Sequence, residues 1–504
     1  MSEALTQQLA LLPDYLSRHL LLSVTALAVG IGLSLPLAFV TIRFRRLQGP
    51  VMMIASAIQT IPGLALLALM VPLLRQIGFL PAVIALILYS VLPVLRNTVT
   101  GIEEVDPNLI EAGRGLGMTP NQLLLRVQLP LAAPVIVAGI RTATVWVVGI
   151  ATLSTPVGAT SLGNYIFSGL QTQNYTAVSV GCFAAAALAL TLDRLVRFIE
   201  IALARRSRRL VAVASTLAVF VLGIGLWPVM FAGSSQDGRL TAVIGTKTFT
   251  EQYILGAVIG EELSAQGFET RTLDSLGSTV AFDALVAGQI DAYVDYTGTI
   301  WANYMNRLGN PGREEIANQV DQWLAEQHGI ELAARFGFEN AYALAVTEAN
   351  AESWNVRTID DLVFRAPGLV MGGDYEFFGR PEWTALQESY GLQFQELVTM
   401  DSTLMYAAVA AGEVDVITAF STDGRIVAFD LALLDDTRGA LPPYDAVLLA
   451  SPGLQARKPE LFRALANFDG AIDADAMRAA NQSVDLNGGT VLDAARELAD
   501  QLLR

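Results

Sequence analysis

The hydrophobic positions follow one pattern up to about residue 232 and a different pattern beyond it. In the first part, apolar residues form long runs separated by short polar connections. Six of these runs approach the roughly 20 residues that a helix needs to cross a bilayer. The predicted spans are 19–42, 51–74, 78–101, 131–153, 177–203 and 210–232. The pattern therefore predicts an all-α membrane domain of about six transmembrane helices.

Beyond residues 232–238, which are typical of a short flexible linker, β-type segments alternate with helical ones. The predicted strands are 241–247, 269–274, 290–295, 342–347, 369–374, 394–398, 414–420 and 445–450. This alternation predicts an α/β domain with mainly parallel sheets. We place the membrane domain at 1–209, the last span and the linker at 210–239, and the α/β domain at 240–504.

Two segments of the α/β part resemble each other. Residues 284–291 (ALVAGQID) parallel residues 408–415 (AVAAGEVD), and each comprises a helix end, a glycine turn and a strand start. Eight residues beyond the glycine, the first copy has Tyr296 and the second has Phe420. Two similar lobes would place these aromatic residues at equivalent strand ends across a cleft. Ligands of open α/β sheets bind at such strand ends.

Charge separates the same two parts. The chain is 53% hydrophobic and only 16% charged, which is too apolar for a wholly soluble protein. Residues 1–239 hold 16 of the 32 basic and 9 of the 48 acidic side chains, a net charge of +7. Residues 240–504 hold the other 16 basic and 39 acidic side chains, a net charge of −23. So acidic a soluble part argues against nucleic acid as a partner.

Arginines cluster in three of the connections between the predicted spans. They follow the first span, surround the connection between the third and fourth spans, and follow the fifth span. Because positive residues favour the cytoplasmic side, these connections are expected in the cytoplasm. The protein is then expected in the cell (inner) membrane, with residues 240–504 on its extracytoplasmic side. The first span is too long, and its end too rich in arginine, for a cleaved signal peptide.

Residue types that bind metals or catalyse reactions are scarce. His19 and His328 are far apart and Cys182 is the single cysteine, so we expect no metal site, no cofactor and no disulfide within the chain. No nucleophile–base set suggests an enzyme. Neither Lys247 nor Lys458 fits the G-x-x-x-x-G-K-[ST] pattern of a phosphate-binding loop, so ATP hydrolysis is expected to need a separate subunit.

The stretch EAGRGLGMTPNQLLLRVQLP (111–130) lies between the third and fourth predicted spans. Thr119-Pro120 is typical of a helix start, with the hydroxyl as cap and proline at the first helical position. Gly113, Gly115 and Gly117 are expected to break the segment before it. The stretch therefore predicts two short helices joined by an elbow.

This stretch resembles the cytoplasmic coupling loop of ABC importer permeases, whose pattern is E-A-A, three residues, G, nine residues, I-x-L-P. The sequence departs from the pattern at Gly113 and Val127. The resemblance implies a permease that sits in membrane lipid as a homodimer and docks a cytoplasmic ABC ATPase subunit. The residues that match the pattern are Glu111, Ala112, Gly113, Gly117, Leu129 and Pro130.

The second part resembles the substrate-binding proteins of glycine betaine, choline and related quaternary-amine importers. The motifs that carry the resemblance are IGTKTFTEQYILG (244–256), LGST (276–279), VDYTGT (294–299), EFFGRPEW (376–383), STDGRI (421–426) and LPPYDAVLL (441–449). They imply a two-lobed, Venus-flytrap periplasmic-binding-protein fold. The whole chain would then be the permease and fused receptor of an ABC importer for a solute of the glycine betaine, ergothioneine, carnitine or choline class.

A trimethylammonium group cannot donate a hydrogen bond, so aromatic faces suit both its charge and its methyl groups. The resemblance implies the ligand-binding residues Lys247, Tyr296, Thr299, Tyr342, Arg380, Phe420 and Tyr444, with the two cations at a ligand carboxylate. Phe420 stands where a tyrosine is usual, which leaves the ligand open. Two alternatives remain: Arg380 could pair with Glu376 or Glu382, and the tyrosines could be ordinary core residues.

Pro62 and Gly63 interrupt the second predicted span beside the polar Gln59 and Thr60. Freed backbone in a membrane helix must line a cavity or face protein. Gln59, Thr60 and Pro62 are therefore expected either to border a translocation path or to mark a packing kink. The alternative function is a ligand sensor or ligand-gated channel with the same receptor, but such a protein has no use for the loop at 111–130.

Overall fold

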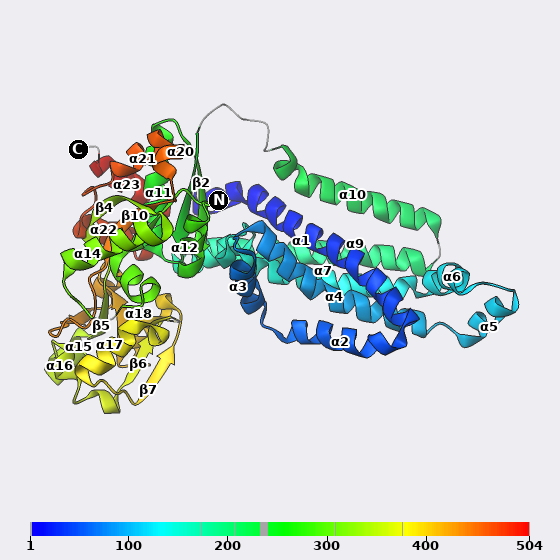
Figure 1. Cartoon of the computed structure of the whole chain (residues 1–504), viewed down its shortest axis with the longest axis horizontal. Helices are drawn as coiled ribbons and strands as arrows, with labels where there is room; N and C mark the ends of the chain where they lie inside the picture. Colours follow the sequence, from blue (N-terminus) through cyan, green and yellow to red (C-terminus); the bar gives the residue numbers. More distant parts are fainter. Residues whose placement is uncertain are drawn as a thin grey trace. The chain divides into compact units, whose positions relative to one another are not determined.

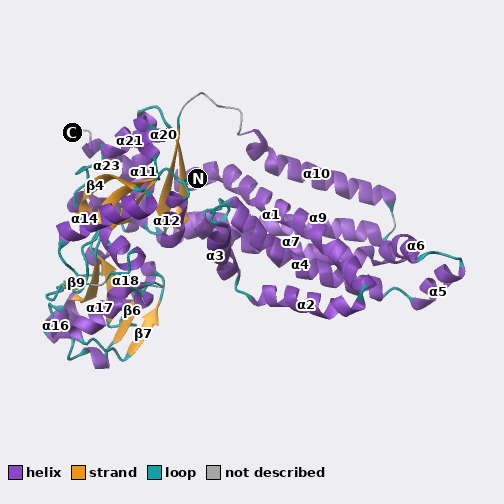
Figure 2. Cartoon of the chain, in the orientation of Figure 1, coloured by secondary structure: helices purple, strands orange, loops and turns teal. Residues whose placement is uncertain are grey.

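The computed structural model describes residues 3–172, 174–205, 207–231, 240–307, 309–374 and 376–502 (Figure 1). It divides into two units, Met1–Gly169 with Tyr175–Asp237, and Leu170–Asn174 with Gly238–Arg504. The first unit is helical, and the strands lie in the second (Figure 2). The predicted linker 232–238 lies outside the described residues.

Long apolar helices build the first unit, and α1, α4, α7 and α9 pack side by side (Figure 1). Five described helical stretches are long and apolar enough to cross a membrane, or six if one bent pair counts as one span. The predicted helical membrane domain is thereby confirmed. Its helices are α1 (Glu3–Arg43), α2 (Arg45–Thr60), α3 (Gly63–Leu74), α4 (Phe79–Glu103), α5 (Pro107–Gly115), α6 (Pro120–Leu123), α7 (Leu129–Ala151), α8 (Gly163–Gln171), α9 (Tyr175–Ala204) and α10 (Arg208–Phe231).

The bent pair is α2 and α3, whose axes differ by 100°. The break lies between Thr60 and Gly63, as the sequence predicts. The carbonyl group of Ile61 accepts a hydrogen bond from the buried Tyr89 hydroxyl of α4. A neighbouring helix thus satisfies a backbone group that the break sets free, which is how kinks within membrane helices are tolerated.

Charged side chains tie α7 to α9. The Arg141 Nε atom lies 2.8 Å from Asp193 Oδ1, and its Nη1 atom lies 3.0 Å from Glu200 Oε2. Charges within apolar helices are costly unless they are paired, and here one cation meets two anions of the next helix. These ion pairs therefore fix the axial register of α7 and α9, which apolar packing alone would specify less strictly.

The second unit contains two five-stranded sheets, with strand orders β2-β1-β3-β10-β4 and β7-β6-β8-β5-β9. Each sheet forms the centre of a lobe, called here the first and the second lobe. The strands are β1 (Thr241–Lys247), β2 (Glu269–Leu276), β3 (Ala292–Tyr296), β4 (Glu331–Glu339), β5 (Tyr342–Thr347), β6 (Val370–Gly373), β7 (Glu396–Thr399), β8 (Val416–Phe420), β9 (Leu431–Leu434) and β10 (Asp445–Ala450).

Helices cover both sheets. Those from residue 240 onward are α11 (Thr250–Ala265), α12 (Ser278–Val286), α13 (Thr297–Thr299), α14 (Arg313–Trp323), α15 (Glu348–Trp354), α16 (Ile359–Leu362), α17 (Pro381–Tyr390), α18 (Ser402–Ala411), α19 (Arg425–Ala428), α20 (Leu454–Arg457), α21 (Pro459–Ala466), α22 (Ala474–Asp485) and α23 (Val491–Leu502).

The chain passes between the lobes twice, from β4 to β5 and from β9 to β10. All eight predicted strands are present, whereas β4 and β9 were not predicted. The expectation of mainly parallel sheets is wrong. Pairs among β1, β2 and β3, and among β6, β7 and β8, are parallel, but β10 and β5 run antiparallel to both of their neighbours. The strands that follow each passage enter the new sheet from its opposite end, which reverses their direction.

The internal repeat is confirmed in the geometry of the two lobes. The glycine turn of each copy has a positive φ, 67° in the first and 72° in the second. The Asp291 carboxylate then accepts a hydrogen bond from the Val243 amide of β1 at 2.9 Å. In the second lobe, Asp415 accepts the equivalent bond from the Val370 amide of β6 at 2.8 Å. The two lobes therefore share one local architecture.

Ionisable groups gather where α22 of the first lobe meets the start of α19. Arg425 pairs with Asp423 through Nε at 2.8 Å and Nη2 at 2.5 Å, and both side chains are buried. Asp485, at the end of α22, accepts a hydrogen bond of 2.7 Å from the Thr250 hydroxyl. Burial raises the pKa of Asp485 to about 6, although Arg425 acts to lower it.

Asp485 should make the second unit less stable as pH rises from about 4 to about 6. The unfolded chain ionises this group near 3.8, so between the two values the folded state binds more protons, and raising the pH favours unfolding. The full rise corresponds to about 3 kcal/mol at most. We expect the thermal-unfolding midpoint of Asp485→Asn to fall less between about pH 4 and about pH 6 than that of the wild type. Scanning fluorimetry of the full chain measures this midpoint.

The control is Asp475→Asn, which removes the same charge from the same helix at a side chain that is 91% exposed. It should retain the wild-type pH dependence. Parallel pH profiles for the wild type and Asp485→Asn would contradict the assignment.

Candidate ligand-binding site

Aromatic rings from both lobes meet between the sheets. Phe249 precedes α11 and Tyr296 ends β3 in the first lobe. In the second lobe Tyr342 begins β5 and Phe420 ends β8, and the antiparallel register of these strands sets the two residues opposite each other. Tyr444 immediately precedes β10. We call these five residues the aromatic cluster.

The rings contact one another in a chain across the lobe boundary. Ring centroids lie 5.7 Å apart for Tyr342 and Tyr444, 5.0 Å for Tyr342 and Phe420, 6.2 Å for Phe420 and Phe249, and 6.1 Å for Phe249 and Tyr296. Such separations are typical of attractive ring pairs. The structure thus brings together the four predicted rings and adds Phe249. This residue lies in the motif 244–256 but is not among the predicted ligand-binding residues.

The tyrosine hydroxyls of the cluster donate to carboxylates. Tyr342 donates to Asp374 at 3.1 Å, and Tyr444 donates to Glu382 at 2.6 Å. Burial raises the pKa of both phenols well above the ordinary value, so they remain neutral donors at physiological pH. The rings are therefore fixed in place while their faces stay uncharged.

Two of the predicted residues follow β3. Thr299 is buried on the turn Thr297–Thr299, and its contact with a ligand remains a prediction. Beside it, a Cβ atom on Gly298 would lie 2.7 Å from the Tyr444 ring. Only glycine lets this backbone lie so close against the aromatic face.

Lys247 is already neutralised in the structure. Its side chain is 3% exposed, and its ammonium group forms an ion pair with the buried carboxylate of Asp295. The same ammonium lies 5.4 Å from the Tyr296 ring centroid and 5.9 Å from that of Tyr293. This geometry favours a role in holding β1 and β3 together. Contact of Lys247 with a ligand carboxylate remains a prediction without support from these distances.

Arg380 precedes α17, and its side chain is 10% exposed. Its guanidinium lies 5.4 Å from the Tyr342 ring centroid, which places the cation directly beside the aromatic cluster. It forms ion pairs with Glu376 and Glu382, so the alternative pairing from the sequence is present as well. Although burial acts to lower it, Tyr342, Glu376 and Glu382 raise the pKa of Arg380 well above its ordinary value.

Glu251 is a further residue at the lobe boundary that the sequence did not single out. Its Oε1 atom accepts hydrogen bonds from Tyr296 at 2.5 Å and Asn340 at 3.0 Å. Its Oε2 atom accepts from Thr422 of the second lobe at 2.5 Å and from Asn481 at 3.2 Å. Burial raises the pKa of Glu251, and the four donors act against this rise.

A small cavity opens beside Glu251. Its volume is 20 Å³, which leaves room for about one water molecule. Phe249 and Phe420 border it, as do Asn340 and Asn481, whose amide oxygen atoms accept no hydrogen bond from the residues that the structure describes. The aromatic cluster thus adjoins a polar recess that offers acceptors.

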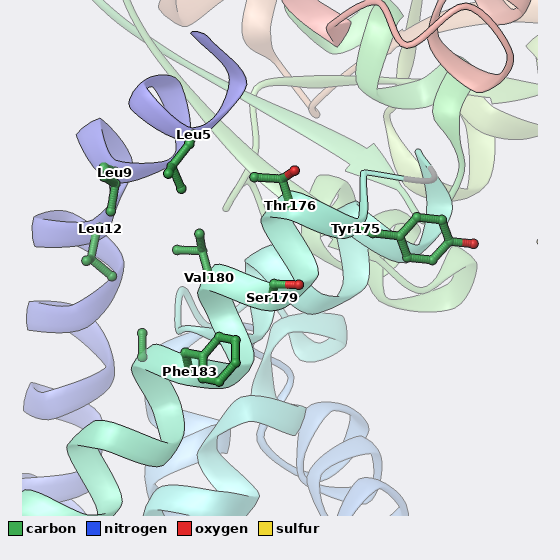
Figure 3. A pocket seen from close by; sticks show the side chains of 9 residues that line it. Leu5, Leu9, Leu12, Tyr175, Thr176, Ser179, Val180 and Phe183 are labelled. Atoms are coloured by element: carbon green, nitrogen blue, oxygen red, sulfur yellow. The ribbon is translucent and has the colours of Figure 1, made fainter. Parts of the chain in front are cut away.

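A larger hollow lies in the first unit between α1 and α9 (Figure 3). The leucine side chains of α1 point toward α9, and the hollow has a volume of 650 Å³. Its lining residues are Leu5, Leu9, Leu12, Tyr175, Thr176, Ser179, Val180, Phe183 and Ala184. The described residues that line the hollow carry no charged side chain.

The predicted coupling stretch forms the end of α5 and, after the elbow, a helix that begins with α6 and continues through η1 (Leu124–Gln128) into α7. The first predicted short helix is present, but the second is not short, so that part of the prediction is wrong. Thr119 caps α6 in a reciprocal pair: its hydroxyl accepts from the Gln122 amide at 3.3 Å, and the Gln122 side chain accepts from the Thr119 amide at 2.9 Å. The predicted helix start is confirmed. Gly117 has a φ of +78°, which suits the elbow.

Gly113 does not break a helix, so that part of the prediction is wrong. It lies within α5 and is buried, and a Cβ atom there would come within 2.7 Å of Leu123 of α6. Its role is to let two helices approach closely. The other residues of the predicted coupling set, Glu111, Ala112, Leu129 and Pro130, lie on α5 and at the start of α7, and their contact with an ATPase remains a prediction.

The residues of the predicted translocation path lie at the break between α2 and α3. Thr60 and Pro62 are exposed, whereas Gln59 is half-buried and its amide lies 3.5 Å from the Tyr89 carbonyl oxygen. The Tyr89 bond to Ile61 supports the packing-kink alternative for the break itself. A role in translocation remains a prediction.

Comparisons with known proteins place both parts of the chain. Residues 241–501 match the model described as the substrate binding domain of ABC-type glycine betaine transport systems. Residues 30–209 match the model of the inner membrane component of binding-protein-dependent transport systems. The matched range includes the stretch 111–130.

Two curated relatives agree with these matches. The ergothioneine transport permease/ergothioneine binding protein EgtU of Helicobacter pylori (strain G27) is 30% identical over 86% of this chain and 80% of its own length. The choline transport system permease protein OpuBB of Bacillus subtilis (strain 168) is 45% identical over 35% of this chain and 80% of its own length. A crystal structure described as a glycine betaine/carnitine/choline ABC transporter is 25% identical over 52% of this chain and 98% of its own, with a TM-score of 0.46. The chain therefore belongs to the multi-pass membrane proteins of the glycine betaine-type ABC importers, and it joins a permease and a substrate-binding domain in one polypeptide.

Proposed function

We propose that the chain imports a small quaternary-amine solute and that the aromatic cluster holds the cationic head. The observation that carries this proposal is that rings from both lobes meet at the lobe boundary. A trimethylammonium group lodged between such rings gains roughly 0.5–2 kcal/mol from each aromatic face. The rings already contact one another in this structure, so the two lobes must separate to admit the cation and then close around it. The names of the relatives, which mention choline, carnitine, glycine betaine and ergothioneine, agree with a ligand of this kind.

The second part of the proposal is that the ligand is a zwitterion whose carboxylate meets Arg380. A guanidinium binds a carboxylate with two parallel hydrogen bonds, which gives orientation as well as affinity. The Nε and Nη1 atoms of Arg380 are buried and form no hydrogen bond to protein among the described residues. Arg380 therefore retains donors for a ligand. Lys247 has a weaker claim because Asp295 neutralises it.

The chain works, in this proposal, as a homodimer in the cell (inner) membrane, with no nucleic acid partner and no ATPase site of its own. Residues 1–209 form the permease, 210–239 the last span and linker, and 240–504 the extracytoplasmic receptor. Each copy docks one separate ABC ATPase through α5, α6 and the elbow between them, and Gln59, Thr60 and Pro62 border the solute path. The fixed geometry of the Thr119 cap and of the contact between Gly113 and Leu123 supports this role, because a force on α5 passes directly to α6.

Binding to the full-length protein tests the proposed ligand class. We expect isothermal titration calorimetry to detect binding of at least one compound among glycine betaine, carnitine, ergothioneine and choline. Phe420→Leu keeps apolar area but removes an aromatic face, so it should weaken binding about five- to thirtyfold, or roughly 1–2 kcal/mol. Phe364→Leu is the control, because that ring is 94% exposed. Equal affinities for Phe420→Leu and the wild type would remove Phe420 from the site.

The elbow should transmit ATP hydrolysis to the permease. Gly117 has a positive φ, and a β-branched side chain is strained in that conformation. We expect Gly117→Val to abolish uptake of a bound solute by cells that express the transporter, with unchanged ligand affinity. Gly267→Val is the control and should keep normal uptake, because Gly267 also has a positive φ and no atom within 4 Å of a Cβ there, but it lies outside the stretch 111–130. Normal uptake by Gly117→Val would show that the elbow does not couple the two subunits.

Cysteine labelling tests the orientation in the membrane. In a Cys182→Ala background, Ser207→Cys lies in the arginine-rich connection after α9, and Thr384→Cys is exposed on α17. A maleimide that cannot cross the inner membrane should label residue 384 in intact cells and residue 207 only after permeabilisation. Labelling of residue 207 from outside would rule out the proposed orientation.

A further inference from the structure

The two carboxylates that neutralise Arg380 differ in their surroundings. The Glu382 side chain has no exposed surface and accepts a hydrogen bond from Tyr444 at 2.6 Å, while its Oε1 atom lies 3.5 Å from Arg380 Nη1. Glu376 is 54% exposed and bonds Arg380 through Nη2. One counterion is therefore built into the lobe, and the other lies at its surface.

The atom that Glu376 contacts is the one a ligand carboxylate needs. A guanidinium offers two forks for bidentate binding, Nε with Nη2 and Nη1 with Nη2, and both include Nη2. Glu376 bonds Nη2, while Nε and Nη1 form no hydrogen bond to protein among the described residues. Nη2 carries two hydrogens, so a carboxylate that binds Arg380 through two bonds either displaces Glu376 or binds beside it, where the two negative charges repel each other.

Displacement of Glu376 costs far less than displacement of Glu382. The Glu376 side chain is 54% exposed, so water solvates its carboxylate once it leaves Arg380, and the ligand carboxylate then pairs with the buried guanidinium in its place. A carboxylate left unpaired in the interior is strongly destabilising. Glu382 would then remain as the permanent counterion and Glu376 would be the exchangeable one.

We propose that Glu376 holds the place of the ligand carboxylate on Arg380 and determines how strongly the receptor prefers solutes that carry one. This inference rests on the proposed function, in which Arg380 anchors the ligand. A zwitterion must either displace Glu376 or place its carboxylate beside the Glu376 charge, and both lower the apparent affinity of the receptor for that zwitterion. Choline has no carboxylate and meets no such competition. Glu376 thus narrows the difference in affinity between zwitterionic and purely cationic solutes.

Calorimetry of the full-length protein with glycine betaine and choline tests this role. We expect Glu376→Gln to strengthen glycine betaine binding about three- to tenfold, the range that loss of a weak competing ion pair allows. Choline binding should change less than twofold. Glu388→Gln is the matched control, because it removes the same charge at an exposed position on α17 and should leave both affinities unchanged. Glu376→Ala serves if the glutamine variant folds poorly.

A thermodynamic cycle separates competition at Arg380 from a general effect of charge. In an Arg380→Ala background, Glu376→Gln should no longer strengthen glycine betaine binding, because the shared partner is gone. An equal gain for choline, no gain for glycine betaine, or a gain that persists without Arg380 would each overturn the inference. Binding of choline but of no carboxylate-bearing solute by the wild type would overturn it too, and leave the proposed amine class standing. Failure to bind any of the four compounds would overturn the proposed function and this inference together.

Discussion

The cost of burying charge governs how the binding domain is built around the boundary between its lobes. Taking an ion out of water costs several kcal/mol unless an opposite charge or hydrogen-bond donors surround it. Lys247 meets Asp295 within the first lobe, and Arg425 meets Asp423 within the second. Because these ion pairs lie within single lobes, the lobes can move apart without leaving either cation unpaired. The buried carboxylates Glu251 and Glu382 differ, since each accepts a donor from an element outside its own lobe.

Some features of the structure follow from neighbouring residues in the sequence, whereas others depend on how distant strands pair. The Thr119-Pro120 helix start followed from three neighbouring residues, and the structure shows the reciprocal cap. The partner of Lys247 did not follow from the sequence. Asp295 lies next to it because β1 pairs with β3 in parallel, with Ile244 opposite Ala292 and each strand continuing three residues further. A change of one residue in that register would turn the carboxylate to the other face of the sheet.

Burial on all sides explains why part of the site was missed. Glu251 lies on α11, where buried side chains occur on every face and no polar stripe marks an orientation. On such a helix the spacing of hydrophobic residues alone does not distinguish a buried glutamate from a solvated one. Phe249 was overlooked for a related reason, since an aromatic residue before a helix is most simply part of the core. The same limit applies to Gly113, because the helix breaker expected from its residue type is in fact the contact point for Leu123.

The aromatic cluster and the two chain passages between the lobes form one mechanical element. Tyr342 stands at the start of β5, immediately beyond the first passage, and Tyr444 lies at the end of the second. Rotation of one lobe relative to the other must therefore move these two rings, whose centroids are 5.7 Å apart. Phe420 moves with Tyr342 because the two are paired across β5 and β8, whereas Phe249 and Tyr296 move with the first lobe. Separation of the lobes thus divides the cluster into two groups of rings. A cation that contacts both groups would oppose this separation, so the cluster links occupancy of the site to closure of the receptor.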